Sequence, residues 1–423
     1  TCSKNPLRGL GPKTAGSAQA YWQALLAADL GTVASLLSNP QSGLSPTLMF
    51  DTSNLEEVLD SPDVAGASSP TGLWSLNYEQ ELTTPLHITA SRGYSACLHH
   101  LLLRGAAVDL APGGRTALHT ACLAASTDCV RMLLSFGADP EAVSEDGYKP
   151  LHLCQRLDST CARLLLQHGA GVTSATEEQE DTALHVAARL GLEDHVKLFL
   201  SHGARLEAQN VEGQTQLNAA CAQSHPPEAM GCYYGVCQQL VEAGAQVNTA
   251  DSDRQRPLHH ACRNANPQVV ELLLARGANV NIMSYSGNTA MHNILQMAAY
   301  KLDHQPERVV RALLNHGAVR VWPGALLKVL RHCCASPRTI EALINSYDRV
   351  LSGHDVSPFS LQKYPNFYSS LFSLGRSPRS LQHLVRCALR NILEGRLLQA
   401  LPELHLPGPL QHFLLLHFED VLY

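Results

Sequence analysis

A four-residue phrase recurs along this chain, and its spacing constrains the fold more than any other feature. Successive copies start 32 or 33 residues apart, except for one step of 41. The seven copies are Thr84-Pro85-Leu86-His87, Thr116-Ala117-Leu118-His119, Lys149-Pro150-Leu151-His152, Thr182-Ala183-Leu184-His185, Thr215-Gln216-Leu217-Asn218, Arg256-Pro257-Leu258-His259 and Thr289-Ala290-Met291-His292. A fixed period of this size indicates one structural unit that repeats and stacks on its neighbours.

A Gly-Ala pair follows every copy of the phrase and marks the end of each unit. The seven pairs begin at Gly105, Gly137, Gly169, Gly203, Gly244, Gly277 and Gly317. Thr at the start of the phrase suits a helix N-cap, and Pro suits the first helical position. Gly can adopt the left-handed conformation that ends a second helix. Each unit is therefore expected to be a helix pair whose apolar face is buried by its neighbours.

The phrase and its period resemble the ankyrin repeat, whose signature is T-P-L-H-x-A over about 33 residues. This resemblance implies an all-α ankyrin-repeat solenoid, built of helix-turn-helix repeats with β-hairpin-like loops, over residues 20–318. Residues 21–37 read as a degenerate eighth unit ahead of the seven clear ones. Residues 39–80 are expected to form a surface loop, and residues 1–19 an N-terminal tail.

Two of the repeats are longer than the others. The phrase and the following Gly are 21 residues apart in four units, but 29 apart in the fifth and 28 in the seventh. The extra residues lie between the two helices, around 224–227 and 303–306, where they leave the stacking face intact. Contact with a target is one interpretation of these insertions, and drift in a tolerant loop is the favoured one.

Composition excludes several classes of protein. Of 423 residues, 45% are hydrophobic and 16% are charged, so the chain can bury a large core. A net charge of -6, without a basic cluster, argues against nucleic acid as a partner. No run approaches the roughly 18 apolar residues of a membrane helix, so no membrane partner is expected. The chain opens on Thr1 rather than Met, which leaves open a natural N-terminus further upstream.

The 13 cysteines do not resemble a disulfide framework, because their number is odd and their spacing irregular. Cys122, Cys221 and Cys262 fall where a repeat helix takes a small buried residue. We therefore expect reduced thiols, and a protein of the cytoplasm with the nucleus as a second compartment.

The 21 histidines raise the hypothesis of a metal site. Six of them end a copy of the phrase, and a residue that recurs once per unit is expected to be structural, for instance by hydrogen-bonding the neighbouring backbone. The cluster His332-Cys333-Cys334 lacks the second Cys pair of a zinc site. Neither a nucleophile elbow nor a phosphate-binding loop occurs. We expect no metal, no cofactor and no catalysis.

The segment after the last Gly-Ala pair changes character. Residues 319–377 keep helical patterning without the phrase and are expected to cover the open end of the last repeat. Beyond them, apolar residues recur with the period of one helix face: Leu381, Leu384, Val385, Ala388, Leu389 and Ile392. A core helix would show the same pattern, but the chain ends about 30 residues later and offers little to cover it. An exposed apolar stripe would indicate a partner site.

Residues 378–423 resemble a SOCS box. In that motif an Elongin-binding helix follows the pattern [STAP]-Leu-x3-Cys-x3-apolar, which Leu381 and Leu389 match while Val385 replaces the Cys. A valine fills a similar volume, at a cost below about 1.5 kcal/mol. A cullin box of Leu-Pro-apolar-Pro then Leu-x2-Tyr-Leu-Leu is similar to this chain at Leu404, Leu406, Pro407, Leu410 and Phe413, with His405 in place of the first Pro and Phe413 in place of the Tyr.

Together the two motifs resemble the ankyrin repeat and SOCS box family. The resemblance implies a non-catalytic substrate-recognition adaptor of a ubiquitin ligase, with Elongin C and Elongin B at the helix of Leu381, Leu384, Val385, Ala388 and Leu389. Cullin-5 with its RING protein would bind at the second set, and an unidentified target at the repeats. A plain ankyrin scaffold, whose altered box no longer recruits a ligase, is the alternative.

Overall fold

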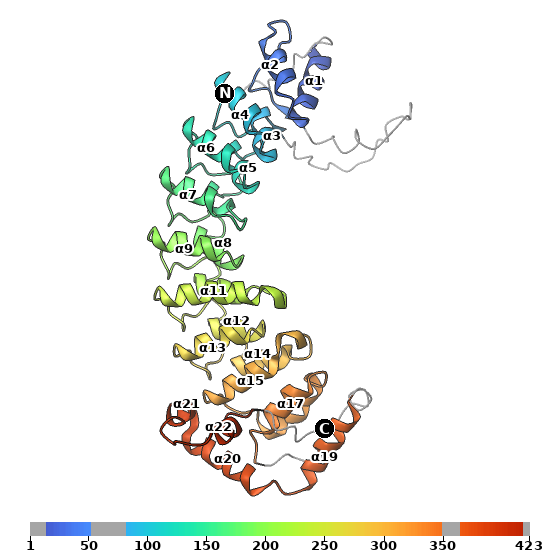
Figure 1. Ribbon diagram of the computed structural model, residues 1–423, viewed down its shortest axis with the longest axis vertical. Coiled ribbons are helices and arrows are strands. Elements are labelled where there is room, and N and C mark those ends of the chain that lie inside the picture. Colours follow the sequence, from blue (N-terminus) through green and yellow to red (C-terminus); the bar gives the residue numbers. More distant parts are fainter. Residues whose placement is uncertain (1–13, 52–81, 349–363, 418–423) are drawn as a thin grey trace. The chain divides into compact units, whose positions relative to one another are not determined.

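The computed structural model describes residues 14–51, 82–348 and 364–417. It divides into two units, each of which is described by itself. The first comprises residues 1–183 with 201–203, and the second comprises residues 184–200 with 204–423. Figure 1 shows both as successions of short helix pairs joined by loops.

The first unit holds the N-terminal helix pairs. Its elements are α1 (Thr14–Leu26), α2 (Leu30–Ser38), β1 (Phe50–Asp51), β2 (Leu82–Thr83), α3 (Pro85–Arg92), α4 (Ser95–Leu103), α5 (Ala117–Leu123), α6 (Thr127–Ser135), the 3-10 turn η2 (Pro150–Leu153) and α7 (Thr160–Gln167).

The second unit holds the remaining repeats and the C-terminal helices. Its elements are α8 (Ala183–Arg189), α9 (Glu193–Ser201), α10 (Gln216–Ala222), η3 (Pro227–Ala229), α11 (Met230–Glu242), α12 (Pro257–Arg263), α13 (Pro267–Ala275), α14 (Ala290–Met297), η4 (Leu302–His304), α15 (Pro306–Asn315), η5 (Pro323–Ala325), α16 (Leu326–His332), α17 (Pro337–Ile344), α19 (Pro365–Arg376), α20 (Leu381–Leu393), η6 (Glu394–Arg396), α21 (Leu397–Ala400) and α22 (Gly408–Leu414).

The expected all-α repeat fold is confirmed. Each glycine of the Gly-Ala pairs has a positive φ, between 80° and 103°, and thereby ends the second helix of its repeat. The loops between repeats are hairpin-like, as in the bond from the Asp251 N–H to the Gln255 carbonyl. Successive loops are linked in turn, for example by the Ser252 N–H and the Glu212 carbonyl.

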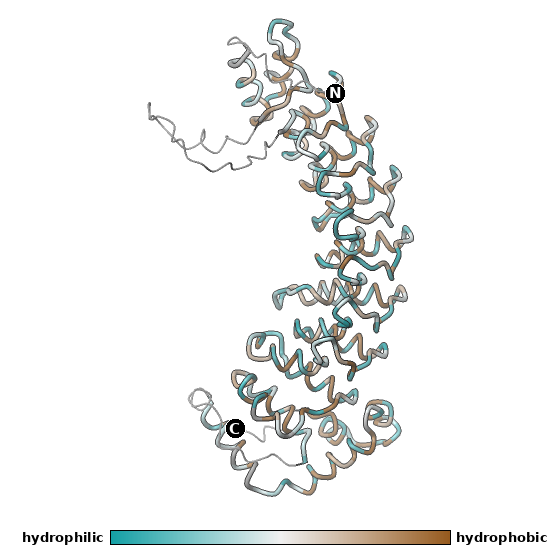
Figure 2. Tube along the Cα trace, turned by 180° about the vertical axis from the view of Figure 1, so that it is seen from behind, coloured by the Kyte–Doolittle hydropathy of each residue, from teal (hydrophilic) through white to brown (hydrophobic). Residues whose placement is uncertain are grey.

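Apolar burial follows the expected pattern. Figure 2 shows hydrophobic and hydrophilic residues alternating along the helices of the repeats. Cys122, Cys221 and Cys262 are buried as predicted. Within the described ranges, no helix is both long enough and apolar enough to cross a membrane.

The third repeat departs from the sequence prediction. Its phrase opens only the short turn η2, where the other six open α-helices. This repeat is one residue shorter between phrase and glycine than the 21-residue units, and Cys154 leaves the helical region with a ψ of 75°. The first helix is therefore cut to a single turn, and Leu157 in the following loop is exposed.

The degenerate N-terminal unit is a helix pair, as predicted. Helices α1 and α2 pack on α3 and α4, and the Tyr94 hydroxyl donates to the Leu26 carbonyl at 3.4 Å. Helix α1 begins at Thr14, so the predicted tail of residues 1–19 is too long. The sequence from Thr14 to Leu26 contains no proline, and the helix continues through Gly16. Part of the predicted loop 39–80 forms β1, which pairs with β2, and residues 52–81 lie outside the described residues.

In five repeats, the histidine that ends the phrase links its repeat to the following loop. Its Nε2 lies 2.7–3.1 Å from a carbonyl oxygen in the following loop, at His87, His119, His152, His185 and His259. In His119, Nδ1 accepts from the Thr116 N–H at 3.2 Å. Because an N–H only donates and a carbonyl only accepts, this ring is neutral and carries its proton on Nε2. The structural role predicted for these histidines is confirmed.

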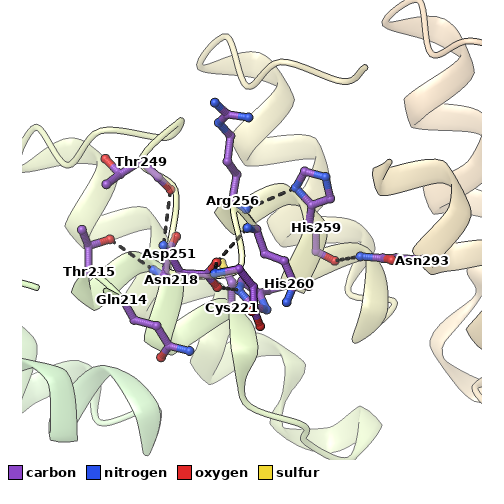
Figure 3. Close-up of polar contacts among 12 residues, drawn as sticks. Gln214, Thr215, Asn218, Cys221, Thr249, Asp251, Arg256, His259, His260 and Asn293 are labelled. Atoms are coloured by element: carbon purple, nitrogen blue, oxygen red, sulfur yellow. Dashed lines mark hydrogen bonds and ion pairs between the residues drawn. The ribbon is translucent and has the colours of Figure 1, made fainter. Parts of the chain in front are cut away.

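The fifth repeat has Asn218 in the histidine position and keeps the same bond. Its amide Nδ2 donates to the Thr249 carbonyl at 3.3 Å, as Figure 3 shows. The Thr215 hydroxyl, which elsewhere contacts the ring, accepts from the Asn218 N–H instead. Asn293 of the seventh repeat donates to the backbone carbonyl of His259 in the sixth, so the polar linkage continues along the second unit.

The two long repeats contact each other across the repeat between them. The Lys301 ammonium lies 3.4 Å from the Ser224 hydroxyl and 3.1 Å from the Asn264 side-chain oxygen. Asn264 in turn donates to the Cys221 carbonyl at 2.8 Å. The rings of His225 and His304 are 6.0 Å apart. The two insertions therefore contact each other and the sixth repeat between them. Neither of the two interpretations given for the insertions in the sequence analysis anticipated this contact.

The segment after the last repeat continues the stack of helices. Helix α16 packs on α14, and α17 packs on α15. The Tyr347 hydroxyl donates to the Val321 carbonyl at 2.6 Å, and the Tyr368 hydroxyl donates to the Cys334 carbonyl at 3.0 Å. Residues 349–363 of the predicted 319–377 segment lie outside the described residues.

The histidine bonds predict a loss of stability in acid. Burial lowers the pKa of His119 below its usual 6.5, so the unfolded chain binds the proton more tightly. The free energy of unfolding should then fall as the pH drops below about 6.5. His119→Asn can keep the bond to the Tyr148 carbonyl, as Asn218 does, but cannot titrate. Denaturant unfolding between pH 7.5 and 5 should therefore show a weaker pH dependence in this variant.

The exposed His202 provides the matched control. His202→Asn should leave the pH dependence unchanged, whereas His119→Ala should cost about 1–3 kcal/mol at pH 7.5 by leaving polar groups unpaired. Identical pH dependence in wild type and His119→Asn would contradict the neutral role of this ring.

Candidate functional site

Helix α20 has its apolar face outward and its polar face inward. Leu381 is 78% exposed, Val385 50% and Ile392 70%. The opposite face carries His383, Arg386, Cys387 and Arg390, which are all buried. This is the reverse of a core helix: the stripe is exposed at Leu381, Leu384, Val385 and Ile392, while Leu389 packs against a buried cluster.

Arg386 and His383 form one half of the buried polar face. The Arg386 guanidinium lies 4.2 Å from the centre of the Phe413 ring and donates to His383 Nδ1 at 2.8 Å. His383 Nε2 donates to the Tyr347 carbonyl at 2.7 Å. Burial, more than the nearby arginines, lowers the pKa of His383 to about 4, so the ring is neutral at pH 7.

Arg390 forms the other half of the buried polar face and connects α20 with α15 and α22. Its Nη1 donates to the Asn315 side-chain oxygen at 2.8 Å and to the Leu414 carbonyl at 2.6 Å. Its Nη2 donates to the Leu314 carbonyl at 3.0 Å. These acceptors lie at the C-terminal ends of α15 and α22, where a cation is stabilised by unpaired carbonyls and the helix dipole. Arg390 thereby fixes α20 and α22 against the last repeat.

A small apolar core holds α21 and α22 against α20. Leu397, Leu401 and Leu414 are buried in it, and Leu389 and Leu406 pack against them. Figure 1 shows these three helices grouped next to α15. The short helix α22 is therefore held by apolar contacts and by the bond from Arg390.

An apolar groove of about 410 Å³ runs between α20 and α22. It is lined by Leu381, Gln382, Val385, Arg386, Leu389, Leu406, Leu410, Phe413 and Leu414. Three residues predicted to bind Elongin and three predicted to bind a cullin therefore meet in one groove. The other predicted residues, Leu384, Ala388, Leu404 and Pro407, do not line it. Leu384 and Ala388 are exposed elsewhere on α20, and Pro407 is the N-cap of α22.

Two of the departures from the family pattern, Val385 and His405, differ in their structural effect. Val385 lines the groove and points outward as a cysteine there would. His405 has a φ of 47°, a left-handed conformation that a proline ring, fixed near -65°, cannot adopt. The backbone before α22 is thus shaped differently from one that carries the usual first proline.

Sequence reasoning missed Arg386 and Arg390 as organising residues. Arginines on a helix usually lie in solvent, and nothing in the sequence placed helix C-termini beside them. Ile392 belongs to the same stripe by its spacing, and its exposure adds it to the surface of α20. Cys387 lies on the buried face of α20, so it does not take the place of the missing cysteine in the groove.

The cluster at residues 332–334 has a structural explanation. Cys333 is buried, and its Sγ lies 3.1 Å from the Leu295 carbonyl, whereas His332 is exposed. Among the residues that the structure describes, no group of three or more His, Cys, Asp or Glu side chains is arranged to hold a metal ion.

Known families match both parts of this architecture. Ankyrin repeats match residues 86–176, 137–210 and 228–323, and the SOCS box matches residues 377–415. The chain is 50% identical to Ankyrin repeat and SOCS box protein 10 of Mus musculus, over 98% of this chain and 91% of the mouse protein. The chain belongs to the ankyrin repeat and SOCS box family.

Further relatives carry the same family name. The human Ankyrin repeat and SOCS box protein 10 is 51% identical over 96% of this chain and 89% of its own length. Ankyrin repeat and SOCS box protein 16 of Mus musculus is 43% identical over 83% of this chain and 78% of its own. The family's combination of repeats and SOCS box fits a substrate adaptor of a cullin–RING ubiquitin ligase, a recognition role rather than a catalytic one.

The contacts of Arg390 predict that α22 depends on this side chain. Arg390→Leu removes the donor of three bonds and should lower the stability of the SOCS box by about 1–3 kcal/mol. Amide hydrogen exchange should then lose protection in α22 and at the end of α15, while α10 to α13 stay protected. Arg396→Leu removes an exposed arginine of the same segment and should have no effect. Unchanged protection of α22 in Arg390→Leu would contradict the role assigned to this guanidinium.

Proposed function

We propose that the protein is the substrate-recognition adaptor of a Cullin-5 ubiquitin ligase. In this proposal, Elongin C binds the outward face of α20 with Elongin B alongside, and Cullin-5 with its RING protein binds near Leu404 to Pro407. The observation that carries the proposal is the reversed polarity of α20. An apolar stripe next to an apolar groove favours a partner protein that covers both.

The repeats are proposed to bind the target. Exposed apolar side chains lie on the hairpin loops of the second unit at Val211, Met283 and Tyr285. The Arg254 guanidinium lies 4.6 Å from the centre of the Tyr285 ring and supports its exposed position. Aromatic and arginine side chains of this kind are enriched at protein interfaces. The identity of the target is not implied by them.

The adaptor contributes to ubiquitin transfer by position alone. A target on the repeats and a ligase on the SOCS box belong to one complex, so the effective concentration of target lysines near the conjugating enzyme rises. We place this activity in the cytoplasm, with the nucleus as a second compartment. The Cys221 and Cys237 sulfurs, 3.8 Å apart as thiols, are compatible with a reducing compartment.

Leu381→Asp should abolish Elongin binding, because it places a charge at an apolar and well exposed position of α20. The measurement is co-expression with Elongin B and Elongin C followed by size-exclusion chromatography. Leu157→Asp makes the same change at an exposed leucine of a repeat loop and should leave the complex intact. Circular dichroism should show equal helical signal in all three proteins. Elongin binding by Leu381→Asp at wild-type affinity would refute the proposed site.

Val385→Cys restores the cysteine of the family pattern and tests the departure directly. Because the two side chains are similar in size, the change in Elongin affinity should be an increase of less than about tenfold. Isothermal titration calorimetry of the two proteins gives this ratio. Weaker binding by Val385→Cys would mean that valine is the better fit in this chain.

The alternative function, an ankyrin scaffold without a ligase, is favoured by the backbone at His405. A cullin partner that needs the usual proline conformation would not find it here. Co-expression separates the two functions: a complex with both Elongins and Cullin-5 supports the adaptor, and a monomer in the presence of all three supports the scaffold.

A further inference from the structure

A second hollow, of about 640 Å³, lies between the last repeat and the SOCS box. Its walls come from the loop after α13, the loop after α15, and helices α20 and α21. Polar residues at its wall include Asn281, His316, Arg320, Arg390 and Asn391. Two guanidinium groups therefore line it, and none of the lining residues is an aspartate or glutamate.

The two guanidinium groups of this hollow donate their hydrogen bonds to neutral acceptors. Arg320 Nη1 donates to the Ser346 carbonyl at 2.7 Å, and its Nη2 donates to the side-chain oxygen of Asn391. Arg390 donates to two carbonyls and to the Asn315 amide oxygen. These oxygens accept hydrogen bonds from the guanidinium N–H groups but carry no formal charge. They therefore do not neutralise the two positive charges.

The electrostatics at Arg390 are consistent with this excess of charge. Burial, with the nearby Arg320 and Arg386 as smaller causes, lowers its pKa to about 10. Three guanidinium groups that repel one another in a partly dehydrated region create a positive potential, which attracts an anion.

We propose that this hollow is a binding site for an oxyanion, either a carboxylate or a phosphate group. Guanidinium groups match the geometry of both and bind them through charge-assisted hydrogen bonds. Arg320 is the half-buried member of the pair, and the exposed Asn391 has an amide NH2 as a further donor. The hollow has room for more than a bare ion, and we assign it to an oxyanion carried by an acidic or phosphorylated peptide segment. The site does not depend on the proposed ligase function.

The test uses the full chain and inorganic phosphate as the probe. Thermal unfolding and isothermal titration calorimetry are run at constant ionic strength, with chloride replaced stepwise by phosphate. Binding to the folded state should raise the unfolding midpoint in a saturable way. Because phosphate also stabilises proteins by exclusion from their surface, the comparison between variants decides the result.

Arg320→Gln removes the charge while keeping a polar side chain, and should weaken phosphate binding at least tenfold. Arg263→Gln removes an exposed arginine at the end of α12, outside the hollow, and should bind phosphate as the wild type does. An equal response of wild type and Arg320→Gln would overturn the proposal. Elongin capture by the same samples is a separate readout, because the hollow does not include the outward face of α20.

Two peptides then distinguish the sources of the oxyanion. A glutamate-rich peptide and a phosphoserine peptide of equal length are each titrated against the phosphate-loaded protein. Displacement by both supports a carboxylate or phosphate ligand, and displacement by the phosphoserine peptide alone restricts the site to phosphate. If neither peptide displaces phosphate, the inference of a peptide-borne oxyanion is wrong.

Discussion

The buried guanidinium of Arg390 determines how the C-terminal helices are arranged. A charged side chain is expensive to bury unless its hydrogen bonds are made, and here the ends of α15 and α22 supply the acceptors. With this contact and the stacking of Arg386 on Phe413, α20 can turn its polar face inward. Its apolar face is left outward as a consequence. The buried Arg390 guanidinium, rather than an apolar core, therefore determines which face of α20 is exposed to a partner.

Most of the repeat fold could be predicted from the sequence, because the information is local and recurs. The phrase located the first helices, and each glycine located the end of a second helix. The histidine position implied a bond to the next loop, which His87 and His259 make. The third repeat escaped prediction because one missing residue shortens its helix, an effect that the period alone does not reveal. The pairing of β1 with β2 depends on residues far apart in sequence and left no local signal.

The site was predictable only in part. Periodicity identified the stripe at Leu381 and Val385, and the short remaining sequence suggested that it is exposed. The meeting of this stripe with Leu410 and Phe413 in one groove depends on the turn through η6 and α21, which the sequence does not specify. The left-handed backbone conformation at His405 could not be predicted either. Replacement of a proline removes a constraint on φ but does not indicate which φ the new residue adopts.

The contact between the two insertions changes how the repeats share stability. In a repeat array each unit is normally coupled only to its immediate neighbours, so unfolding can stop at any interface. The bond from Lys301 to Ser224 couples repeats five and seven directly, across the repeat between them. Asn264 of repeat six bonds to both sides of this contact, to the Lys301 ammonium and to the Cys221 carbonyl. We therefore expect repeats five to seven to unfold together, because these bonds add to the coupling of each repeat with its immediate neighbours.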